Sequence, residues 1–258
     1  MTTAGDLDLL RDAALEAGKL ALAMRPGVKT WSKEGGSPVT AADLAVDDLL
    51  KTRLLAARPD YGWLSEETAD DPARLGCRRV FVVDPIDGTV AFIRGRPWWV
   101  VSVAVVEAGR PVAGVLVAPE LDQTYEAETG GGARLNGGPI APSGRETLED
   151  AAVLGDRRVL TAPGWPPLRI DHRNSVAYRM AQVADGTFDA AVALSGKCDW
   201  DLAAADLIAN EAGAMVSDHR GQAFIYNRPA ARQQSLVCAT PALQPLILAK
   251  VSHIELPN

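Results

Sequence analysis

The chain has 258 residues, a length that suits one large domain or two closely fused halves and exceeds that of a lone binding motif. Hydrophobic residues make up 47% and charged residues 23%, a globular balance that excludes disorder as the default state. The 26 Lys and Arg residues against 33 Asp and Glu residues give a net charge of −7. This balance argues against a nucleic acid polymer or an anionic membrane as partner, but it still allows a small anionic substrate.

Cysteine usage and the N-terminus bear on the compartment. Cys77, Cys198 and Cys238 are far apart and form no CxxC pair, so neither a disulfide framework nor a thiolate zinc site is expected. The first residues lack the basic and apolar regions of a secretion signal, and no apolar run approaches the length of a membrane span. We therefore expect a reduced, cytoplasmic protein without a membrane partner.

Two helices are predicted near the N-terminus. Apolar residues recur at spacings of three and four over residues 6–24, the periodicity of an amphipathic helix. Thr40 precedes Asp43 by three positions at the head of residues 41–57, so Thr40 can cap a second helix and Asp43 can complete a capping box. The intervening residues 31–39 are rich in Gly, Ser and Pro and predict a loop.

Strand signals follow these helices. The run Val80–Val83 is short and wholly apolar, which is typical of a strand buried on both faces. Residues 98–106 and 111–119 flank a four-residue connection and predict a hairpin. Residues 130–138 form a tight, glycine-rich connection.

The C-terminal part of the chain alternates strands with helices. Strand candidates lie at residues 190–194 and 236–239, and helices are predicted at residues 175–184 and 203–212. Gly186 and Gly213 stand where the C-terminal caps of these helices belong. Because strands and helices are mixed throughout, we predict a layered α/β or α+β enzyme, and no clean linker divides it into independent domains.

The segment from Asp84 to Thr89 carries the strongest chemical signal. A buried strand leads directly into Asp84, where a carboxylate costs several kcal/mol unless it is paired or bound to metal. Pro85 should force the chain out of the strand, so Asp87 can turn back towards Asp84 with the Ile86 carbonyl between them. Such a cluster of hard oxygen ligands suits Mg²⁺ or Mn²⁺.

A structural explanation exists for each acid taken alone. Asp84 can end a strand and Asp87 can cap a helix, while Asp43 is explained locally by capping. Glu66 and its neighbour Glu67 follow a possible strand and are ordinarily solvated charges. Asp201 opens an alanine-rich helix, where an N-cap aspartate is the simplest interpretation. What favours a site is that separate strand and helix ends all present carboxylates, because a fold that brought them together would need cations at its centre.

Four segments, in this order, resemble the inositol-monophosphatase-like superfamily of Mg²⁺-dependent, lithium-sensitive phosphatases. They are SPVTAAD (37–43), LSEE (64–67), VVDPIDGT (82–89) and WDLAAADLIANEAG (200–213), and GGGARLNG (130–137) is similar to the superfamily's glycine-rich turn. The resemblance implies a layered αβαβα sandwich of the inositol-monophosphatase/fructose-bisphosphatase type. It also implies one phosphatase domain with an N-terminal half of about residues 1–145 and a C-terminal half of about residues 146–258, and usually a homodimer.

The resemblance also implies the roles of individual residues. Metal ligands are expected at Glu66, Asp84, the Ile86 carbonyl, Asp87 and Asp201. Asp43 and Thr89 would orient and activate the nucleophilic water, and the backbone amides of Gly88 and Thr89 would hold the phosphate. We expect two or three Mg²⁺ ions as cofactor, with Mn²⁺ as a substitute and with Li⁺ and Ca²⁺ as inhibitors. Two such ions can bind both the attacking and the leaving oxygen of an in-line displacement.

The substrate prediction rests on finer features. Residues 190–195 lack the glutamate that animal-type inositol monophosphatases place before the WD motif, and residues 87–92 depart from the family's DGTTNF. Residues 33–40, 91–106 and 198–206 look more like the bacterial 3'(2'),5'-bisphosphate nucleotidase branch. The leading hypothesis is hydrolysis of adenosine 3',5'-bisphosphate. Inositol-1-phosphate is the alternative, followed by histidinol phosphate and fructose 1,6-bisphosphate.

A substrate with two phosphates would suit additional cations. The candidates are Lys33, Arg94, Arg96 and Lys197, and Trp98 or Trp99 could stack on an adenine ring. Asn174 and Ser175 fall near the position where the family contacts its sugar or inositol ring. The simpler interpretation of Arg94 and Arg96 is that they are solvated loop charges. The simpler interpretation of Trp98 and Trp99 is that they lie in the core. His172, His219 and His253 have no partner motif and are expected to be structural or exposed.

Two other classes of protein stay open. The residues 84–87 could form the DxD-like metal site of a nucleotide-sugar transferase, which phosphate release without an acceptor sugar would exclude. A non-catalytic relative acting through protein contacts would show no activity on any phosphomonoester in the presence of Mg²⁺.

Overall fold

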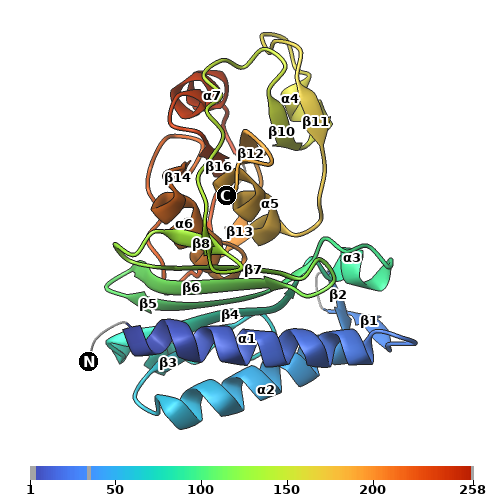
Figure 1. Ribbon diagram of the computed structural model, residues 1–258, viewed down its shortest axis with the longest axis vertical. Helices are drawn as coiled ribbons and strands as arrows, with labels where there is room; N and C mark the ends of the chain where they lie inside the picture. The colour runs from blue at the N-terminus through green and yellow to red at the C-terminus, as the bar shows by residue number, and fades with distance from the viewer. Residues whose placement is uncertain (1–3, 34–35, 257–258) are drawn as a thin grey trace.

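The computed structural model describes residues 4–33 and 36–256. Figure 1 shows helices and sheets in alternating layers: α1 and α2, a seven-stranded sheet, α5 and α6, a five-stranded sheet, and α7 on its far side. This αβαβα order confirms the layered α/β fold predicted from the sequence. The helices are α1 (Ala4–Met24), α2 (Ala41–Ala57), α3 (Thr89–Ile93), α4 (Arg157–Leu160), α5 (Val176–Ala184), α6 (Asp199–Ala212) and α7 (Leu243–Val251), with a 3₁₀ turn at Pro72–Gly76.

The first sheet has the strand order β3-β4-β5-β6-β7-β8-β9. Strands β3 and β4 are parallel, and every later pair is antiparallel. The predicted hairpin is β5–β6, which turns at Ala108 and Gly109 with positive φ at both, as two-residue hairpin turns require. The strands are β3 (Gly62–Ser65), β4 (Arg79–Asp87), β5 (Val100–Glu107), β6 (Arg110–Ala118), β7 (Gln123–Glu128), β8 (Ala133–Leu135) and β9 (Gly138–Pro139).

The second sheet has the order β11-β10-β12-β16-β14, and the chain enters it after β9. Strands β11, β10 and β12 are parallel, whereas β16 runs antiparallel to β12 and to β14. Its strands are β10 (Ala152–Gly155), β11 (Arg169–Asp171), β12 (Ala190–Ala193), β14 (Met215–Ser217) and β16 (Leu236–Ala239). Two short ribbons, β1 (Thr30–Ser32) with β2 (Pro38–Thr40) and β13 (Lys197–Cys198) with β15 (Arg232–Gln233), lie outside both sheets.

Buried apolar clusters fill the spaces between the layers. Phe81 and Val83 of β4 pack with α1 and α2, whereas Val80 and Val82 pack with α5 and α6, because alternate residues of a strand face opposite sides. The continuous apolar run is therefore buried on both faces, as the sequence predicted. Fully burying each such side chain contributes about 1.5–3 kcal/mol.

Helix α6 lies directly against the first sheet at Gly114 of β6. A Cβ atom at this glycine would lie 3.0 Å from the Cα of Ala204, so the helix backbone approaches the strand as closely as the missing side chain allows. This contact fixes the helix that carries Asp201 against the sheet that carries Asp84 and Asp87.

Three local expectations are wrong: the loop at residues 31–39, the start of the helix predicted at residues 203–212, and the end of the strand at Pro85. The predicted loop of residues 31–39 overlaps β1 and β2, whose three residues each are too few to show a period-two pattern. Glu34 and Gly35 of this loop lie outside the described residues. The helix predicted at residues 203–212 begins at Asp199, so Asp201 is its third residue and Cys198 is its N-cap. The Cys198 N–H donates to Asp201 Oδ2 at 2.8 Å, which makes the earlier start favourable.

Pro85 does not end its strand. Asp84 pairs with Ser102 and Asp87 pairs with Val100, so three steps along β4 oppose two along β5. This bulge accommodates Pro85, which has no N–H to donate, and the strand continues to Asp87. The bulge also places both aspartates at the same end of the sheet.

Candidate active site

Three carboxylates from two layers of the fold converge. Asp84 and Asp87 come from the end of β4, and Asp201 comes from the first turn of α6. Each offers one oxygen such that these oxygens all lie within 4.8 Å of one another. The predicted convergence of strand and helix ends is therefore present in the structure.

The carboxylates line a cavity of about 200 Å³. Every metal ligand that the resemblance implies contributes to its wall, as do Gly88, Thr89 and Asn174 among the predicted substrate contacts. The lining residues are Ser37, Pro38, Glu66, Asp84, Ile86, Asp87, Gly88, Thr89, Val90, Asn174 and Asp201.

Asp43 lies behind this cavity and reaches it through Thr89. Its Oδ2 accepts hydrogen bonds from the Thr40 N–H at 2.8 Å and from Thr40 Oγ1 at 2.6 Å, which completes the capping box of α2. Its Oδ1 lies 3.3 Å from Thr89 Oγ1, which also lies 3.1 Å from the Ile86 carbonyl oxygen. The single hydroxyl proton of Thr89 can be donated to either oxygen. The Asp43 carboxylate therefore both caps α2 and contacts Thr89, which lines the cavity.

Burial and mutual repulsion disfavour charge on the three converging acids. Burial, with the charges of Glu66 and Asp87, raises the pKa of Asp84 well above its usual range. Burial raises the pKa of Asp87 to about 6, although a hydrogen bond from Ser175 opposes the rise. Burial and the charge of Asp87 raise the pKa of Asp201 to about 7. In the described chain no Lys, Arg or His side chain forms an ion pair with these three carboxylates. The donor set therefore fits divalent cations that prefer oxygen, which would relieve this repulsion.

Glu66 stands at the edge of the carboxylate group beside a lysine. Lys33 Nζ lies 3.0 Å from Glu66 Oε1 and 2.7 Å from Glu67 Oε1. Burial raises the pKa of Glu67 to about 7, although Lys33 opposes the rise. Lys33 thus reaches the site through Glu66, from the ribbon formed by β1 and β2.

Gly88 makes the turn from β4 into α3. Its φ is +99°, a conformation that favours glycine, and a Cβ atom there would lie 3.0 Å from the Trp98 carbonyl oxygen and 3.1 Å from Ser175 Cβ. The chain can therefore turn at this point only because the residue has no side chain. The turn presents the first residues of α3 to the cavity.

The other predicted substrate contacts lie in different surroundings. Ser175 is fully buried, and its hydroxyl donates to Asp87 Oδ2 at 2.6 Å. Lys197 Nζ donates to the Ser195 hydroxyl and to the carbonyls of Ser195 and Gly196, and burial lowers the pKa of Lys197 although Asp201 opposes the shift. Arg94 and Arg96 are exposed, as the simpler interpretation expected.

The two tryptophans proposed to stack on a base lie in different surroundings. Trp99 is fully buried against Phe92, and its indole N–H donates to Glu120 Oε1 at 2.7 Å. The Trp98 ring is covered by the Arg173 guanidinium, 4.1 Å from the ring centroid. Trp99 therefore packs in the core, as the simpler interpretation expected, and the stacking alternative does not hold for it.

The sequence interpretation missed Arg179 on α5. This arginine is 8% exposed, and its Nε donates to the Arg173 carbonyl at 2.6 Å, but within the described chain it forms no ion pair with a carboxylate. Its charge opposes the rise in the pKa of Asp87. Burial is the main cause that lowers the pKa of His172 and of Lys197, and the charge of Arg179 lowers both pKa values further. A cation amid the apolar residues of a short helix was the available signal.

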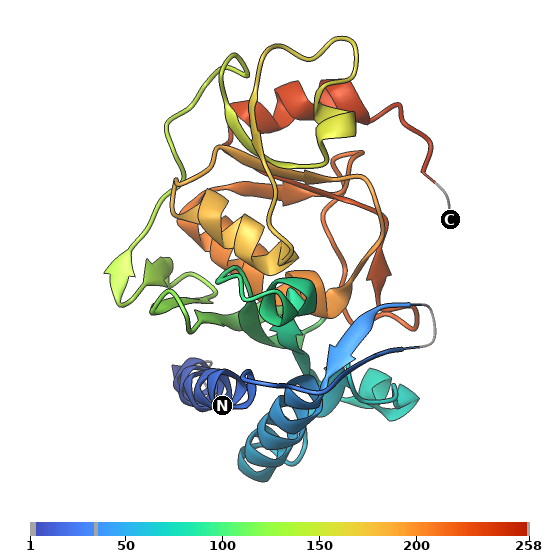
Figure 2. The same ribbon diagram turned by 90° about the vertical axis from the view of Figure 1, so that its right-hand side faces the viewer.

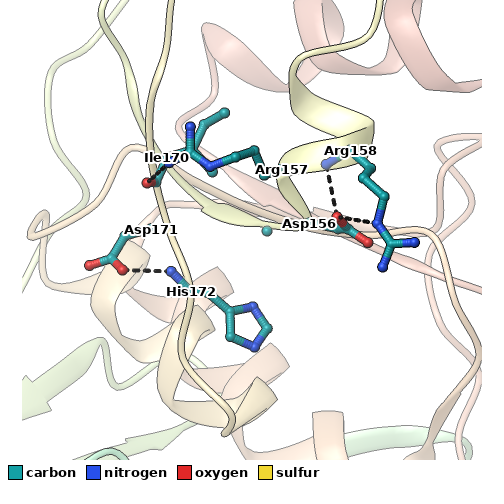
Figure 3. A pocket seen from close by; sticks show the side chains of 7 residues that line it. Asp156, Arg157, Arg158, Ile170, Asp171 and His172 are labelled. Atoms are coloured by element: carbon teal, nitrogen blue, oxygen red, sulfur yellow. Dashed lines mark hydrogen bonds and ion pairs between the residues drawn. The ribbon is translucent and has the colours of Figure 1, made fainter.

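A larger cavity of about 450 Å³ lies at the carboxyl ends of β10 and β11. Figure 3 shows its charged side chains, of which Arg158 lies 3.7 Å from Asp156 and Asp171 accepts from the His172 N–H at 2.7 Å. His172 and His253 are exposed, and His219 is buried with Nδ1 2.8 Å from Ser235 Oγ. As expected, the wall of the 200 Å³ cavity contains no histidine among the described residues.

Comparisons with known proteins agree with this geometry. The sequence matches the inositol monophosphatase family over residues 6–256. A histidinol-phosphatase of Chlorobaculum parvum is 33% identical over 261 residues, which cover 97% of this chain and 98% of the relative. A 3'(2'),5'-bisphosphate nucleotidase CysQ of Aggregatibacter actinomycetemcomitans is 32% identical over 210 residues, which cover 76% of this chain and 77% of the relative. An IMPase structure from Thermotoga maritima has a TM-score of 0.83 at 27% identity and covers 96% of both chains.

Fold, site and relatives together define a metal-dependent phosphatase. The chain belongs to the inositol monophosphatase family. The family resemblance, the fold type and the enzyme class predicted from the sequence are confirmed.

Across residues 4–33 and 36–256, no helix combines the length and the apolar character needed to cross a membrane.

Proposed function

We propose that this phosphatase is a Mg²⁺-dependent phosphomonoesterase in which a metal-activated water attacks phosphorus. The observation that carries the proposal is the convergence of Asp84, Asp87 and Asp201 beside the Thr89–Asp43 contact. Two or three Mg²⁺ ions would be held by Glu66, Asp84, the Ile86 carbonyl, Asp87 and Asp201, with Mn²⁺ able to substitute and with Li⁺ and Ca²⁺ inhibitory. When bound, such ions acidify a water molecule and neutralise the phosphoryl and leaving oxygens.

The protein's own groups orient the water and take its proton. Thr89 Oγ1 accepts a hydrogen bond from the water while it donates its own proton to Asp43 Oδ1. Asp43 stays fixed because Thr40 holds its other oxygen. Burial raises the pKa of Asp43 above its usual range, which makes this carboxylate a better proton acceptor than a solvated one. The amides of Gly88 and Thr89, at the turn into α3, bind the phosphate.

We further propose that the leaving group carries a second anionic group, which favours adenosine 3',5'-bisphosphate as substrate and AMP as product. Arg179 supports this substrate because it is a buried guanidinium whose charge acts on Asp87 and Lys197 without a carboxylate partner in the described chain. A dianionic phosphate is the natural partner for such a planar donor. Lys197, Lys33 and Asn174 would complete the binding of the leaving group.

Inositol-1-phosphate is the alternative substrate, and fructose 1,6-bisphosphate is a weaker one. Histidinol phosphate is favoured by one specific observation, the relative that matches 97% of this chain. Histidinol phosphate has a cationic amine in place of a second phosphate, so Arg179 would repel this leaving group. Arg179 therefore favours adenosine 3',5'-bisphosphate and disfavours histidinol phosphate as substrate.

The deciding experiment compares kcat/KM for adenosine 3',5'-bisphosphate, inositol-1-phosphate and histidinol phosphate, at the same saturating Mg²⁺ concentration. We expect kcat/KM to be at least about tenfold higher for the bisphosphate, which corresponds to a difference of about 1.4 kcal/mol in transition-state binding. A clear preference for either other substrate would overturn the nucleotide proposal but keep the phosphatase mechanism. Loss of all activity on addition of a chelator, with recovery on Mg²⁺ addition, tests the metal separately.

We also propose that residues 1–258 form one phosphatase domain, that the enzyme is a homodimer and that it is cytoplasmic. The three cysteines are free, which supports a reducing compartment. The dimer rests on the family resemblance and is tested by sedimentation of the purified protein.

A further inference from the structure

Asp87 takes part in both the carboxylate group and the N-terminus of α5. It lies at the end of β4 as one of the three converging carboxylates, and it also accepts hydrogen bonds from the N-cap and first residues of α5. Figures 1 and 2 show α5 in the layer next to the sheet that contains β4. Asp87 Oδ2 accepts from Ser175 Oγ and from the Ala177 N–H, each at 2.6 Å, and its Oδ1 accepts from the Val176 N–H at 3.3 Å. Residues from the second half of the chain therefore fix a carboxylate of the first.

The contact is close and tightly packed. Ser175 is 0% exposed, and the neighbouring Gly88 is confined by the Ser175 backbone nitrogen, which would lie 3.2 Å from a Cβ atom at that glycine. Ser175 Oγ also accepts from the Tyr178 N–H at 2.9 Å, as the N-cap of α5. Its one proton is thus donated to Asp87, and none is left for a substrate.

The two oxygens of Asp87 differ as a result. Oδ2 holds two short hydrogen bonds and has no acceptor position left, whereas Oδ1 holds one long hydrogen bond and retains a free lone pair. The Ser175 hydroxyl, together with the N–H groups of Val176 and Ala177, therefore fixes the plane of the carboxylate so that the free lone pair of Oδ1 keeps one direction. Groups that fix a ligand in this way typically change metal affinity by about 10- to 100-fold when they are removed.

We propose that Ser175 is a positioning residue for metal binding, which holds Asp87 in its ligating orientation, and that it is not a substrate contact. The inference rests on the proposed function, because it takes Asp87 to be a metal ligand. It also makes the join between β4 and α5 part of the metal centre. Metal affinity then depends on a hydroxyl that belongs to the helix carrying Arg179.

The test measures Mg²⁺ binding by calorimetry without substrate, and steady-state kinetics in parallel. Ser175→Ala should weaken Mg²⁺ binding by about tenfold or more and raise the Mg²⁺ concentration for half-maximal activity by a similar factor. At saturating Mg²⁺ the KM for the phosphomonoester should stay within about twofold of the wild-type value. Ser175→Gly should give the same result, because glycine keeps most of the capping stability but lacks the hydroxyl.

Thr240→Ala is the matched control. Thr240 is 1% exposed, accepts from the Leu243 N–H at the start of α7 at 3.3 Å and donates to the Arg145 carbonyl at 2.9 Å, so it is also a buried hydroxyl at a helix start. This variant should lose stability in urea unfolding but keep Mg²⁺ affinity.

The outcomes separate this inference from the proposed function. Mg²⁺ affinity within about twofold of wild type in both Ser175 variants, or an equal loss in Thr240→Ala, would overturn the positioning role alone. A raised KM with unchanged Mg²⁺ affinity would make Ser175 a substrate contact. Wild-type protein that binds neither Mg²⁺ nor Mn²⁺ would overturn the proposed function, and this inference with it.

Discussion

The two cavities described above differ in a way that separates volume from chemistry. The larger, of about 450 Å³, has exposed charges of both signs that pair with each other or with nearby backbone, such as Arg158 with Asp156. The smaller, of about 200 Å³, contains Asp84 and Asp87, which are almost fully buried and lack a cationic partner in the described chain. Exposed pairs contribute about 0–1 kcal/mol, whereas a buried unpaired carboxylate costs several. A fold retains such a cost where an ion or a substrate relieves it, so uncompensated buried charge favours the smaller cavity as the active site more than its size does.

The largest expected effect comes from removing a charge in the small cavity. Asp201→Asn should lower kcat/KM at limiting Mg²⁺ by about 10³-fold or more, equivalent to roughly 4 kcal/mol, because an amide is a poor ligand for a divalent ion. Circular dichroism should show an unchanged fold. Asp171→Asn in the larger cavity is the matched variant and should leave kcat/KM within about twofold. Similar losses in both variants would remove the distinction between the cavities.

A smaller effect is expected at Thr89, beside the three converging carboxylates. Thr89→Ala removes the hydroxyl between the water and Asp43, and should lower kcat by about 100-fold through lost proton transfer. Mg²⁺ affinity, measured by calorimetry, should change by less than about threefold, since the hydroxyl acts on water and not as a main ligand. If the loss appeared in Mg²⁺ affinity and kcat at saturating Mg²⁺ stayed normal, Thr89 would be a ligand and not a proton relay.

The pH dependence of Mg²⁺ binding should also distinguish the cavities. Protons must leave Asp87, with its pKa of about 6, and Asp201, with its pKa of about 7, before these groups bind metal. Mg²⁺ affinity should therefore fall by roughly tenfold or more between pH 8 and pH 6, with proton release on binding. In the larger cavity, hydrogen bonds from His172 and Arg173 lower the pKa of Asp171, so this carboxylate stays charged over the same range. Calorimetry in buffers of different ionisation enthalpy measures the released protons, and a pH-independent affinity would contradict the pKa values.

The smallest expected effect concerns the substrate. Arg179→Gln should lower kcat/KM for adenosine 3',5'-bisphosphate by about tenfold, because one charged hydrogen-bonding partner of the second phosphate is lost. Activity on inositol-1-phosphate should change by less than about threefold, since that substrate carries no second anion. Arg157→Gln in the larger cavity is the control and should change neither value. An equal loss on both substrates would make Arg179 a structural residue.

The sequence predicted best what local patterns determine. The apolar run of β4, the hairpin of β5 and β6 and the capping box of Thr40 and Asp43 each depend on neighbouring residues, and each is confirmed. The carboxylates of the small cavity were found because their segments resemble a family whose members bring these strand and helix ends together. Their convergence itself is a long-range property that no single segment contains.

What the sequence could not predict depends on packing between layers. Whether Trp99 faces the core or a ligand is decided by its contact with Phe92, and the burial of Arg179 is decided by the elements around α5. The ribbon of β1 and β2 is too short to show an alternating pattern. Ser175 was recognised as a polar residue near the site, but its hydroxyl bond to Asp87, 88 positions away, appears only in the folded chain.

Gly88 has a consequence for attempts to change the substrate of this enzyme. Because a Cβ atom there would meet both the Trp98 carbonyl and Ser175, any mutation at this position should push β4 away from α5 and disturb the three converging carboxylates. A mutant library for new specificity should therefore keep Gly88 and Ser175 constant. It should randomise Asn174, which lines the cavity, and Arg179, which we propose binds the second phosphate. Under the proposed function, different residues carry catalysis and substrate selection, so the substrate can be changed while catalysis is kept.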